Sequence, residues 1–426
     1  MGTFNVELKK IVNDSYEIEI GFGLEEKLIS DLKNGLVGNI SKFAVITDST
    51  VKELYADRIL DKLIQEDYHA DLFVFEAGEK SKTRRTKEVI EDAMLEKGYR
   101  RDCCIIAVGG GVVTDLAGFV AGTFGRGVPF INYATTLLAA ADASVGGKTA
   151  VDTPLATNLI GLFNQPEKVY LDIATWKTLP KRQISSGLAE TIKHACLANR
   201  EFFDFLKEHM NEILAIEKDA CEHIANENCK IKYEVVMKDE RESGLREVLN
   251  LGHTVGRAIE TVSDYRLLHG EALSIGMVAE VKLAYKLGYV TETEMHEVIN
   301  LLERADLPIA IPDYIDREVN ASLSGGELKR IEIATILARS TKLSVFDEPE
   351  AGIDLWSFGN LIKVFEKMHE KTQGSILIIS HQERILNIAD KIVVLVDGRV
   401  QSVGEKGDVL PSLLGKDACK ALTEKL

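Results

Sequence analysis

The sequence lacks the features that mark secreted, membrane-spanning or disulfide-linked proteins. Only six of its 426 residues are cysteines, and their positions show no paired spacing, which indicates reduced thiols rather than a disulfide framework. No run of about 18 apolar residues occurs, and the first residues, MGTFNVELKK, contain no apolar core of a signal peptide. We therefore expect a cytoplasmic protein with no membrane partner.

A basic excess is also missing. The 51 lysines and arginines are outnumbered by 67 aspartates and glutamates, which gives a formal net charge of −16 and argues against a nucleic-acid partner. A local basic pocket can still hold a phosphorylated metabolite. The length, together with 45% apolar residues, predicts two or three domains with true cores.

Glycine and apolar runs gather between Ile105 and Gly161. The apolar run 105–108 leads into Gly109-Gly110-Gly111, and a helical pattern follows at once, which predicts strand, tight turn and helix. Glycines at such a turn let a ligand approach the backbone, and the free N–H groups at a helix start favour a phosphate. A tight turn that binds no ligand is the alternative.

Strand and helix patterns alternate before this stretch. Strands are predicted at 43–47 and 70–75, and helices at 51–65 and 84–97. This order predicts a parallel sheet with ligands at the carboxyl ends of its strands. Asp48 and Glu79 follow such ends and are candidates to bind ribose hydroxyls, unless they cap the helices that follow. Residues 4–21 alternate apolar and polar, which predicts half-buried antiparallel strands.

From about residue 166 the pattern changes to long helices. Segments 185–199, 201–239 and 254–262 show 3.6-residue periodicity, which predicts a second, α-helical domain. The cleft between a nucleotide-binding sheet and a helical domain is the usual place for chemistry.

A carboxylate and two histidines in this second region form a candidate metal site. Glu190 lies on a predicted helix, and His253 and His269 lie on separate segments. One Glu and two His make a three-ligand zinc set with an open position, although each histidine taken singly can be structural. Cys221, His223 and Cys229 are a weaker metal candidate because they lack finger-type spacing.

Several cations lie inside apolar or glycine-rich segments, where an unpaired charge is costly. They are Arg126, Lys148, Lys193, Lys232 and Arg246. A phosphorylated, carboxylated substrate would supply anionic partners. Ion pairs within the protein, with Asp142, Glu190 or Glu242, are the alternative.

Ordered motifs over about residues 1–313 resemble the 3-dehydroquinate synthase family of the sugar-phosphate cyclase superfamily. The motifs are GGGVVTDLAGFVAGTFGRG, YATTLLAAADASVGGKTAVDTPL, NLIG, WKTLP, SGLAETIKH and ESGLREVLNLGHT. The resemblance implies a Rossmann-like α/β NAD-binding domain over 1–165 and an α-helical metal- and substrate-binding domain over 166–318.

The resemblance also implies an activity. Family members are cytoplasmic homodimers that use NAD and a divalent metal, zinc or cobalt, to convert 3-deoxy-D-arabino-heptulosonate 7-phosphate into 3-dehydroquinate and phosphate in the shikimate pathway. Glu190, His253 and His269 would bind the metal. The implied NAD contacts are Asp48, Gly78, Glu79, Lys82, Gly111, Val112, Val113, Asp115, Thr135, Thr136, Lys148, Thr175 and Thr178. The implied substrate contacts are Arg126, Asp142, Lys148, Lys193, Lys232, Arg246 and Asn250, with Glu242 close by.

Two positions depart from the family pattern. Ala156-Thr157 stands where the family commonly has Gly-Lys, and Arg257 stands where it commonly has a second histidine. One cation is lost and one is gained, so the two changes can compensate. They also raise the alternative of a related cyclase with another sugar-phosphate substrate.

After residue 313 the family's lysine-rich closing segment is missing. Residues 320–426 instead resemble the C-terminal half of an ABC-type ATPase, such as the ATPase subunit of the iron–sulfur-assembly system. The matching motifs are the signature Ser324-Gly325-Gly326-Glu327, the Walker B carboxylates Asp347 and Glu348, the D-loop Asp354 and the switch His381.

This tail lacks the phosphate-cradling loop of such ATPases. The only Gly-Lys-Thr in the chain is 147–149, and Asp142 occupies the position of the required first glycine. We therefore predict a partial α/β ABC segment over 319–426. No Gly/Pro/Ser-rich linker occurs at 314–320, which favours a chimeric gene product over an evolved fusion. An inactive chimera, or a tail that completes the ATP site of an ABC-type ATPase partner, is the alternative.

Overall fold

The computed structural model describes residues 13–153, 156–263, 265–310, 343–350, 375–396 and 398–414, together with 361, 362, 365, 366 and 369. The chain forms two compact units, Met1–Tyr314 and Ile315–Leu426. The division falls just before the boundary that the sequence predicts at 318/319. Each unit is described by itself.

A six-stranded sheet with the strand order β1-β8-β5-β4-β2-β3 organises the first unit. Every neighbouring pair in this sheet is parallel. Its strands are β1 (Glu17–Gly21), β2 (Lys42–Asp48), β3 (Ala70–Phe75), β4 (Cys103–Gly109), β5 (Phe130–Ala134) and β8 (Lys168–Asp172). Residues of β4 and β5 are buried throughout, as in parallel strands covered on both faces. The predicted parallel sheet is confirmed.

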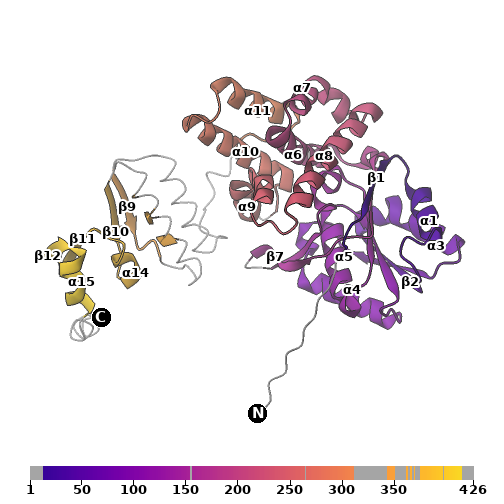
Figure 1. Cartoon of the computed structure of the whole chain (residues 1–426), viewed down its shortest axis with the longest axis horizontal. Coiled ribbons are helices and arrows are strands. Elements are labelled where there is room, and N and C mark those ends of the chain that lie inside the picture. Colours follow the sequence, from indigo (N-terminus) through magenta and orange to yellow (C-terminus); the bar gives the residue numbers. More distant parts are fainter. Residues whose placement is uncertain are drawn as a thin grey trace, which may run out of the picture. The chain divides into compact units, whose positions relative to one another are not determined.

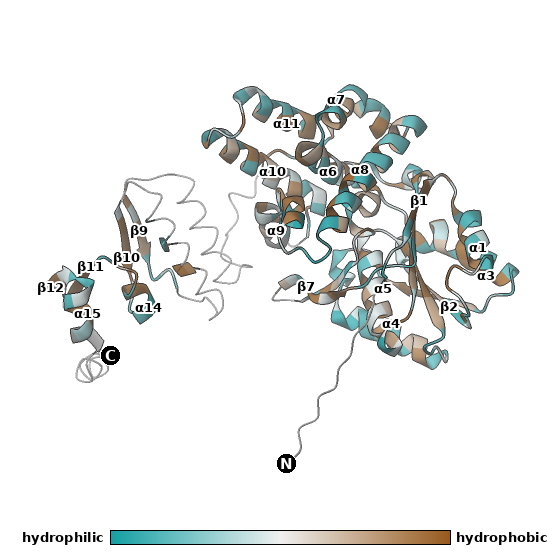
Figure 2. Ribbon diagram, viewed as in Figure 1, coloured by the Kyte–Doolittle hydropathy of each residue, from teal (hydrophilic) through white to brown (hydrophobic). Residues whose placement is uncertain are grey.

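Helices cover both faces of this sheet (Figures 1 and 2). Apolar residues of α1 (Glu25–Lys33) and α3 (Asp57–Gln65) pack on one face. Those of α4 (Arg84–Glu96) and α5 (Gly111–Thr123) pack on the other. The predicted helix 51–65 is interrupted: α2 (Ser49–Val51) and a π-helical turn, η1 (Lys52–Ala56), precede α3.

The first described strand corrects one prediction. β1 is parallel to β8, with Glu17 opposite Lys168, so the expected antiparallel pairing is wrong for this strand. Alternating apolar and polar residues indicate a half-buried edge strand, but they do not indicate the direction of a partner far along the chain. Residues 4–12 lie outside the described part.

An antiparallel hairpin forms the last part of the glycine-rich stretch. Its strands are β6 (Lys148–Thr153) and β7 (Ala156–Phe163). Gly161 is required there, because a Cβ at this position would lie 2.0 Å from the Thr149 carbonyl oxygen. The sheet then resumes with β8, beyond residue 165, so the predicted boundary between the α/β and helical domains falls before its last strand in sequence.

Six long helices complete the first unit. They are α6 (Lys181–Ala198), α7 (Arg200–Leu214), α8 (Lys218–Lys238), α9 (His253–Val262), α10 (His269–Lys286) and α11 (Glu292–Arg304). The largest apolar cluster joins residues of α6, α7, α8, α10 and α11 to Ala134 of β5 and Leu171 of β8, so these five helices pack directly on the carboxyl end of the sheet. The predicted helical segment 201–239 consists of two helices, α7 and α8.

The described part of the second unit contains two strand pairs. Strands β9 (Leu343–Asp347) and β10 (Ser375–Ile379) are parallel, and β11 (Lys391–Val396) and β12 (Arg399–Glu405) are antiparallel. Helices α14 (Glu383–Leu386) and α15 (Lys406–Leu414) accompany them. The signature motif 324–327 and Asp354 lie outside the described residues.

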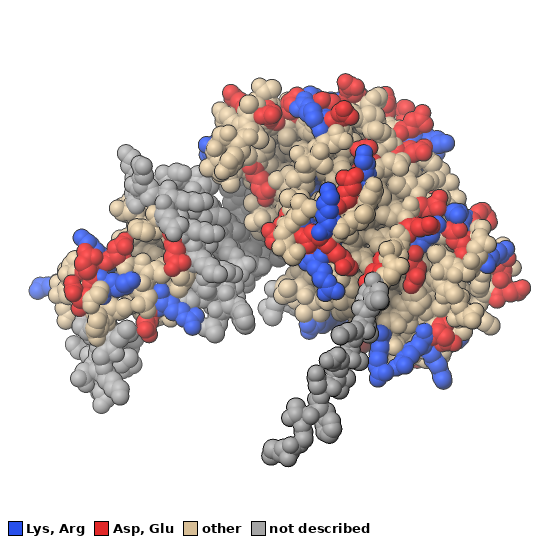
Figure 3. All heavy atoms as spheres, viewed as in Figure 1, with Lys and Arg blue, Asp and Glu red and all other residues tan. Residues whose placement is uncertain are grey.

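Charge is distributed rather than concentrated on the face shown in Figure 3. Among the coloured residues of that face, lysine and arginine side chains are interspersed with aspartate and glutamate. As far as the chain is described, its helices are too short or too polar to cross a membrane.

Candidate active site

A cavity of about 460 Å³ lies in the first unit, where the β6–β7 hairpin faces the helices. Charged and polar side chains from distant parts of the sequence meet there. The lining includes Asp115, Asp142, Lys148, Thr157, Lys193, Lys232, Glu242, Arg246, Asn250, His253 and Arg257. Most of the predicted substrate contacts are thus brought together in one place. Arg126, at the end of the short helix η3 (Phe124–Arg126), is exposed and does not line this cavity.

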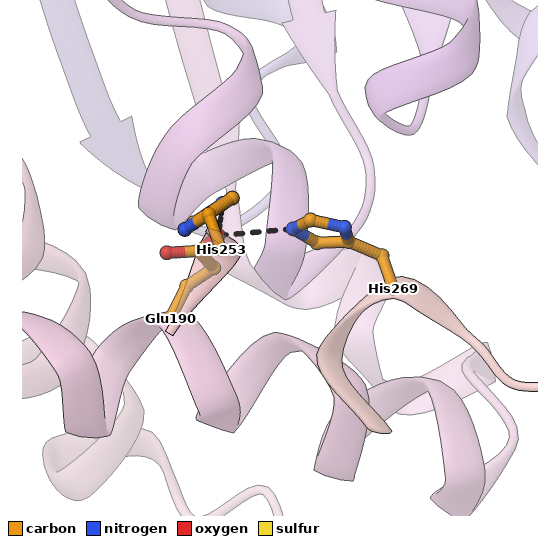
Figure 4. Close-up of side chains that lie close together, drawn as sticks. All are labelled: Glu190, His253 and His269. Atoms are coloured by element: carbon orange, nitrogen blue, oxygen red, sulfur yellow. Dashed lines mark hydrogen bonds and ion pairs between the residues drawn. The ribbon is translucent and has the colours of Figure 1, made fainter. Parts of the chain in front are cut away.

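The three predicted metal ligands converge beside the cavity (Figure 4). Glu190 is fully buried on α6, and His253 and His269 are the first residues of α9 and α10. The Nε2 atoms of His269 and His253 lie 3.2 Å and 3.5 Å from Glu190 Oε1. Two imidazoles and one carboxylate therefore direct their ligand atoms at a common point.

The other nitrogen of each imidazole is also engaged. His269 Nδ1 lies 3.2 Å from Glu260 Oε2, and His253 Nδ1 lies 3.2 Å from the Leu251 carbonyl oxygen. An acceptor on Nδ1 leaves the Nε2 lone pair for a metal, as is usual for metal-ligating histidines. The donor set and its supporting contacts fit a divalent metal such as zinc or cobalt.

The electrostatics of this group favour a cation. Burial alone would raise the pKa of Glu190, but Lys193 and the two histidines outweigh it and hold that pKa well below its ordinary value. Burial lowers the pKa of His269, yet hydrogen bonds to Glu190 and Glu260 raise it to about 10. The carboxylates thus attract positive charge, here a proton on His269, to the place where a metal would bind.

The three lysines of the cavity form ion pairs within the protein. Lys193 pairs with Glu190, and Lys148 pairs with Glu242. Lys232 Nζ lies 2.7 Å from Asp142 Oδ1. The alternative of ion pairs within the protein is therefore realised for Lys148, Lys193 and Lys232. Because an anionic ligand can take the place of these carboxylates as a partner, the pairs are compatible with a substrate site.

Burial and neighbouring charges act against each other on the pKa values of Lys232 and Asp142. It lowers the pKa of Lys232, and Asp142 counteracts this only in part. The pKa of Asp142 is held below its ordinary range despite burial, because Lys232 and Lys193 lie close to it. Arg246 is 2% exposed and donates to the Gly146 carbonyl oxygen at 3.1 Å. The cavity therefore contains buried charges, Lys193, Lys232 and Arg246, as well as partly exposed ones.

The predicted NAD contacts surround the carboxyl edge of the sheet. Asp48 ends β2, Gly78 and Glu79 follow β3, residues 111–115 open α5, Thr135 and Thr136 follow β5, and Thr175 and Thr178 lie in the short helix η5 (Ile173–Thr178) after β8. No side chain caps the first turn of α5, which leaves backbone N–H groups for a phosphate. The buried Thr135 hydroxyl has no hydrogen-bond partner among the described residues. These features fit a dinucleotide.

Several of these side chains have structural partners. Asp48 caps α2 by accepting from the N–H groups of Thr50 and Val51 at 2.9 and 2.8 Å. Thr83, not Glu79, caps α4. The Val113 side chain is buried in the core, and the Thr175 hydroxyl donates to the Thr135 carbonyl oxygen at 2.9 Å. The capping alternative is thus realised for Asp48.

Lys82 joins three elements. Its Nζ contacts Asp115 Oδ2 at 2.5 Å and Asn158 Oδ1 at 2.6 Å, so it connects the β3–α4 turn with α5 and the hairpin. Burial lowers the pKa of Lys82, but Asp115, Glu79 and Asp152 outweigh it and raise that pKa above its ordinary value. Lys82 therefore stays charged at the edge of the sheet.

The cysteine cluster is not a metal site in the described residues. Cys221 and Cys229 are buried, whereas His223 is exposed, and these residues are not among the groups whose ligand atoms converge. Burial raises the pKa of Cys221 to about 12, which keeps the thiol protonated. The acidic helical segment simply packs its cysteines inward on α8.

Two further residues beside the candidate site, Glu260 and His194, were given no role from the sequence. Glu260 lies two helical turns after His253 on α9, and that spacing places both on one face of the helix. His194, fully buried, lies one turn after Glu190 and offers a ligand atom within 4.8 Å of atoms on Asp142 and Glu190. Burial lowers the pKa of His194 to about 4. The signal available in the sequence was the helical spacing of Glu260 from His253 and of His194 from Glu190, both predicted ligands.

Comparisons with known proteins agree with this geometry. The family models "3-dehydroquinate synthase N-terminal" and "3-dehydroquinate synthase C-terminal" match residues 72–186 and 187–324, the second match running past residue 313. The 3-dehydroquinate synthase of Nitrosococcus oceani is 45% identical over 318 residues, which cover 74% of this chain and 86% of that protein.

Solved structures of sugar-phosphate cyclases share the fold. A 2-epi-5-epi-valiolone synthase from Streptomyces hygroscopicus subsp. jinggangensis, with NAD+ and Zn2+ bound, is similar with a TM-score of 0.68 and 27% identity over 79% of this chain and 90% of that one. A 2-deoxy-scyllo-inosose synthase complexed with carbaglucose-6-phosphate, NAD+ and Co2+ has a TM-score of 0.63 and 27% identity over 68% and 81%. With a parallel α/β sheet, a helical part and a Glu-His-His site in the expected order, the chain belongs to the 3-dehydroquinate synthase family.

Proposed function

We propose that the chain is a 3-dehydroquinate synthase, an NAD- and metal-dependent lyase that converts 3-deoxy-D-arabino-heptulosonate 7-phosphate into 3-dehydroquinate and phosphate. The convergence of Glu190, His253 and His269 beside a cavity rich in lysine and arginine carries this proposal. Identity of 45% to a curated synthase supports it. The enzyme acts in the cytoplasm as a homodimer, as the family does.

Different residues of the chain bind the metal, NAD and the substrate. When bound, the metal and NAD supply a Lewis acid and a hydride acceptor. Glu190, His253 and His269 hold the metal, and the carboxyl edge of the sheet holds NAD. Lys148, Lys193 and Lys232 exchange their carboxylate partners for the anionic groups of the substrate and balance the charge of the departing phosphate.

The polar residues of the cavity orient the substrate. Asn250 Nδ2 donates to Glu242 Oε1 at 2.8 Å, which fixes both side chains beside Lys148. Asp142 holds Lys232 in the lining of the same cavity. A substrate in the cavity would meet fixed hydrogen-bond donors and acceptors, which would hold its ring hydroxyls in one orientation.

A related cyclase activity on another sugar phosphate is the second candidate. Thr157 and Arg257, the two departures from the family pattern, both line the cavity. They alter its charge where a substrate would lie. Release of phosphate from another sugar phosphate, and not from the heptulosonate phosphate, would favour this candidate.

The decisive experiment is a phosphate-release assay on the purified full chain. We expect release from the heptulosonate phosphate that requires NAD and is abolished by a chelator. Glu190→Gln should lose metal and activity together, whereas Glu292→Gln, on an exposed carboxylate of α11, should keep both. Absence of release from a chain that has bound both NAD and metal would contradict the proposal.

We also propose that residues 320–426 are the C-terminal half of an ABC-type ATPase segment. Strand β9 leads to Asp347 and Glu348, and β10 lies parallel beside it. His381 Nδ1 lies 3.5 Å from Glu348 Oε1, which is compatible with a switch histidine beside a catalytic carboxylate. Without a phosphate-binding loop the segment needs an ABC-type ATPase partner to supply one. ATP hydrolysis that appears only on mixing with an intact ABC subunit would support this proposal, and no hydrolysis on mixing would contradict it.

A further inference from the structure

Residues 239–244 connect α8 to the short helix η6 (Leu245–Asn250). This connection carries Glu242 and leads into Arg246, and both of these residues line the cavity. Asp239, the first residue after α8, is 9% exposed and is not among the residues that line the cavity. Neither the sequence patterns nor the family resemblance gives Asp239 a role.

The Asp239 carboxylate accepts hydrogen bonds from four donors in the segment that follows it. Oδ1 accepts from the Ser243 N–H at 2.8 Å and from the Ser243 hydroxyl at 3.0 Å. Oδ2 accepts from the Gly244 N–H at 2.9 Å and from the Arg246 N–H at 3.0 Å. The N–H groups of Arg246 and Ser243 lower the pKa of Asp239 to about 2, so these hydrogen bonds are charge-assisted at neutral pH. One charged side chain therefore fixes three peptide groups of a single turn.

Glu242 lies inside this turn in a backbone conformation that side chains rarely adopt. Its φ is 56°, in the left-handed region, and such a conformation persists where surrounding contacts impose it. The next N–H along the chain belongs to Ser243 and donates to Asp239. The hydrogen bonds to Asp239 thus hold the backbone directly after Glu242 and oppose its return to a more common conformation.

The backbone conformation of Glu242 determines where its carboxylate lies. Asn250 Nδ2 donates to Glu242 Oε1 at 2.8 Å, and Lys148 pairs with Oε2. Arg246 supplies the third backbone N–H to Asp239. A carboxylate outside the cavity lining is therefore connected through the backbone to Glu242 and Arg246, and through Glu242 to two further side chains of the cavity.

We propose that Asp239 is a positioning residue: it holds the 239–246 turn in the shape that presents the Glu242 carboxylate and the Arg246 guanidinium to the substrate. This role rests on the proposed function, in which both side chains belong to the substrate site. Asp239 acts by keeping the turn ordered before the substrate binds. Without its carboxylate the turn relaxes, and part of the binding energy of the substrate is then used to order it again.

A double-mutant cycle separates this role from a general loss of structure. Asp239→Asn keeps the shape of the side chain but replaces one acceptor oxygen with an N–H donor, so one pair of hydrogen bonds is lost. We expect kcat/KM to fall about ten- to a hundredfold, with bound metal and NAD per chain unchanged. In a Glu242→Gln background the same substitution should cost at most about threefold, because the group that Asp239 positions is already altered.

Asn199→Ala is the matched control. Asn199 also follows a helix and accepts from backbone N–H groups, those of Glu201 and Phe202, at 2.9 and 3.2 Å, but it is not among the residues that line the cavity. Loss of this cap should lower Tm and leave kcat/KM within about twofold of wild type.

Hydrogen exchange gives a readout that does not require activity. In the wild-type full chain, the amide protons of Ser243, Gly244 and Arg246 should be protected, and in Asp239→Asn they should exchange about tenfold faster while those of α6 are unchanged. Unprotected amides in the wild-type chain, an Asp239→Asn variant with wild-type kcat/KM, or the same factor lost in both backgrounds would overturn the proposal. If the wild-type chain releases no phosphate, the proposed function fails, while hydrogen exchange still decides whether Asp239 holds the turn.

Discussion

Glu190 connects the metal position with the substrate cations because its two oxygens have different neighbours. Oε1 faces His253 and His269, and Oε2 faces Lys193. A fully buried carboxylate is costly unless such partners surround it. Because the partners compete for one charge, whatever binds the histidines also changes how firmly Lys193 is held.

The support that Glu260 gives to His269 leads to a prediction about metal affinity. Glu260→Gln removes the charge that accepts from His269 Nδ1 at 3.2 Å, so the ring becomes less basic and less firmly oriented. We expect metal to bind about 10- to 100-fold more weakly, measured by competition with a chromophoric chelator. Glu292→Gln removes an exposed carboxylate 4.0 Å from His296 and should leave the affinity unchanged. Equal affinities in all three proteins would refute this role.

Arg257 is one of the two predicted departures from the family pattern, and it lines the cavity. It follows His253 by one turn of α9 and lines the same cavity as Thr157. If Arg257 offsets the cation missing at Thr157, then Arg257→His should raise KM for the sugar phosphate by about tenfold. Thr157→Lys in the same background should restore part of the loss. Unchanged affinity and turnover in Arg257→His would show that the two departures are unrelated.

The convergence of Glu190, His253 and His269 was predicted from the sequence, whereas the residues that contact them were not. The three residue types suit a metal, and the motifs around them resemble a family. Glu260 was not found, since its contact with His269 depends on how separate helices pack. Asp48 shows the converse: its position at a strand end was predicted, but its carboxylate caps α2.

Close packing of α6, α9 and α10 places the predicted metal ligands. A Cβ on Gly276 of α10 would lie 2.0 Å from the Gly252 carbonyl oxygen, and one on Gly270 would lie 1.9 Å from that of Ser186. Backbone therefore contacts backbone where α10 crosses the start of α9 and α6. His253 follows the first contact and His269 precedes the second, and both are predicted metal ligands.

Gly276→Ala tests this arrangement. The added methyl group must displace Gly252, and with it His253, so we expect a loss of about 1–3 kcal/mol in unfolding free energy together with weaker metal binding. Chemical denaturation and metal titration measure the two effects. Gly407→Ala, where a Cβ would meet nothing within 4 Å, is the control. A Gly276→Ala variant with unaltered metal affinity would mean that α9 adjusts without moving His253.

A charged cluster joins β8, β1 and α1 at the far end of the sheet. Asp31 accepts from Lys168 at 2.9 Å, from Tyr170 at 2.8 Å and from Lys27 at 2.8 Å. Burial raises the pKa of Asp31, but these three donors outweigh it and lower the pKa to about 2. The carboxylate thus helps to hold the edge strand β1 in place.

The lowered pKa predicts an acid-dependent contribution to stability. A depressed pKa stabilises the fold above the ordinary value near 4, and the contribution is lost as the pH falls from about 4 to 2. Asp31→Asn should therefore cost about 2 kcal/mol at pH 7 and progressively less at pH 4 and pH 3, in urea unfolding. Asp57→Asn, in a surface pair with Lys52, should cost little at any pH. A cost for Asp31→Asn that does not shrink with acid would contradict the assignment.

Strands and helices were predicted correctly where local periodicity determines them. Features that depend on residues distant in the sequence were missed. The strands at 43–47, 70–75 and 105–108 and the helix at 185–199 follow from local patterns. The direction of β1 depends on its pairing with β8. Lys168 of β8 forms an ion pair with Glu17 of β1, although the two residues are far apart in the sequence. The break between α7 and α8 lies at Ala215–Glu217, where no proline or glycine signals it.

The two units of the chain differ in the size of their cores. In the first unit, three clusters of buried apolar residues cover the sheet on both faces and fill the helical part. In the described part of the second unit, one cluster contains Phe346, Leu361 and Phe365, and another contains Ile392, Val409 and Leu410. The composition of the whole chain does not predict this contrast, whereas the end of the family motifs at residue 313 falls next to the division after Tyr314.

Removal of the second unit is therefore the most informative change to the whole molecule. A chain that ends at Ile315 retains the three large clusters and every assigned ligand of metal and NAD. We expect it to unfold within about 2 °C of the main transition of the full chain and to bind metal equally, because stability resides in the buried apolar surface that both proteins share. Phosphate release should also be equal. If the shorter chain binds metal and NAD but releases phosphate more slowly, residues 316–426 contribute to turnover and are more than an appended fragment.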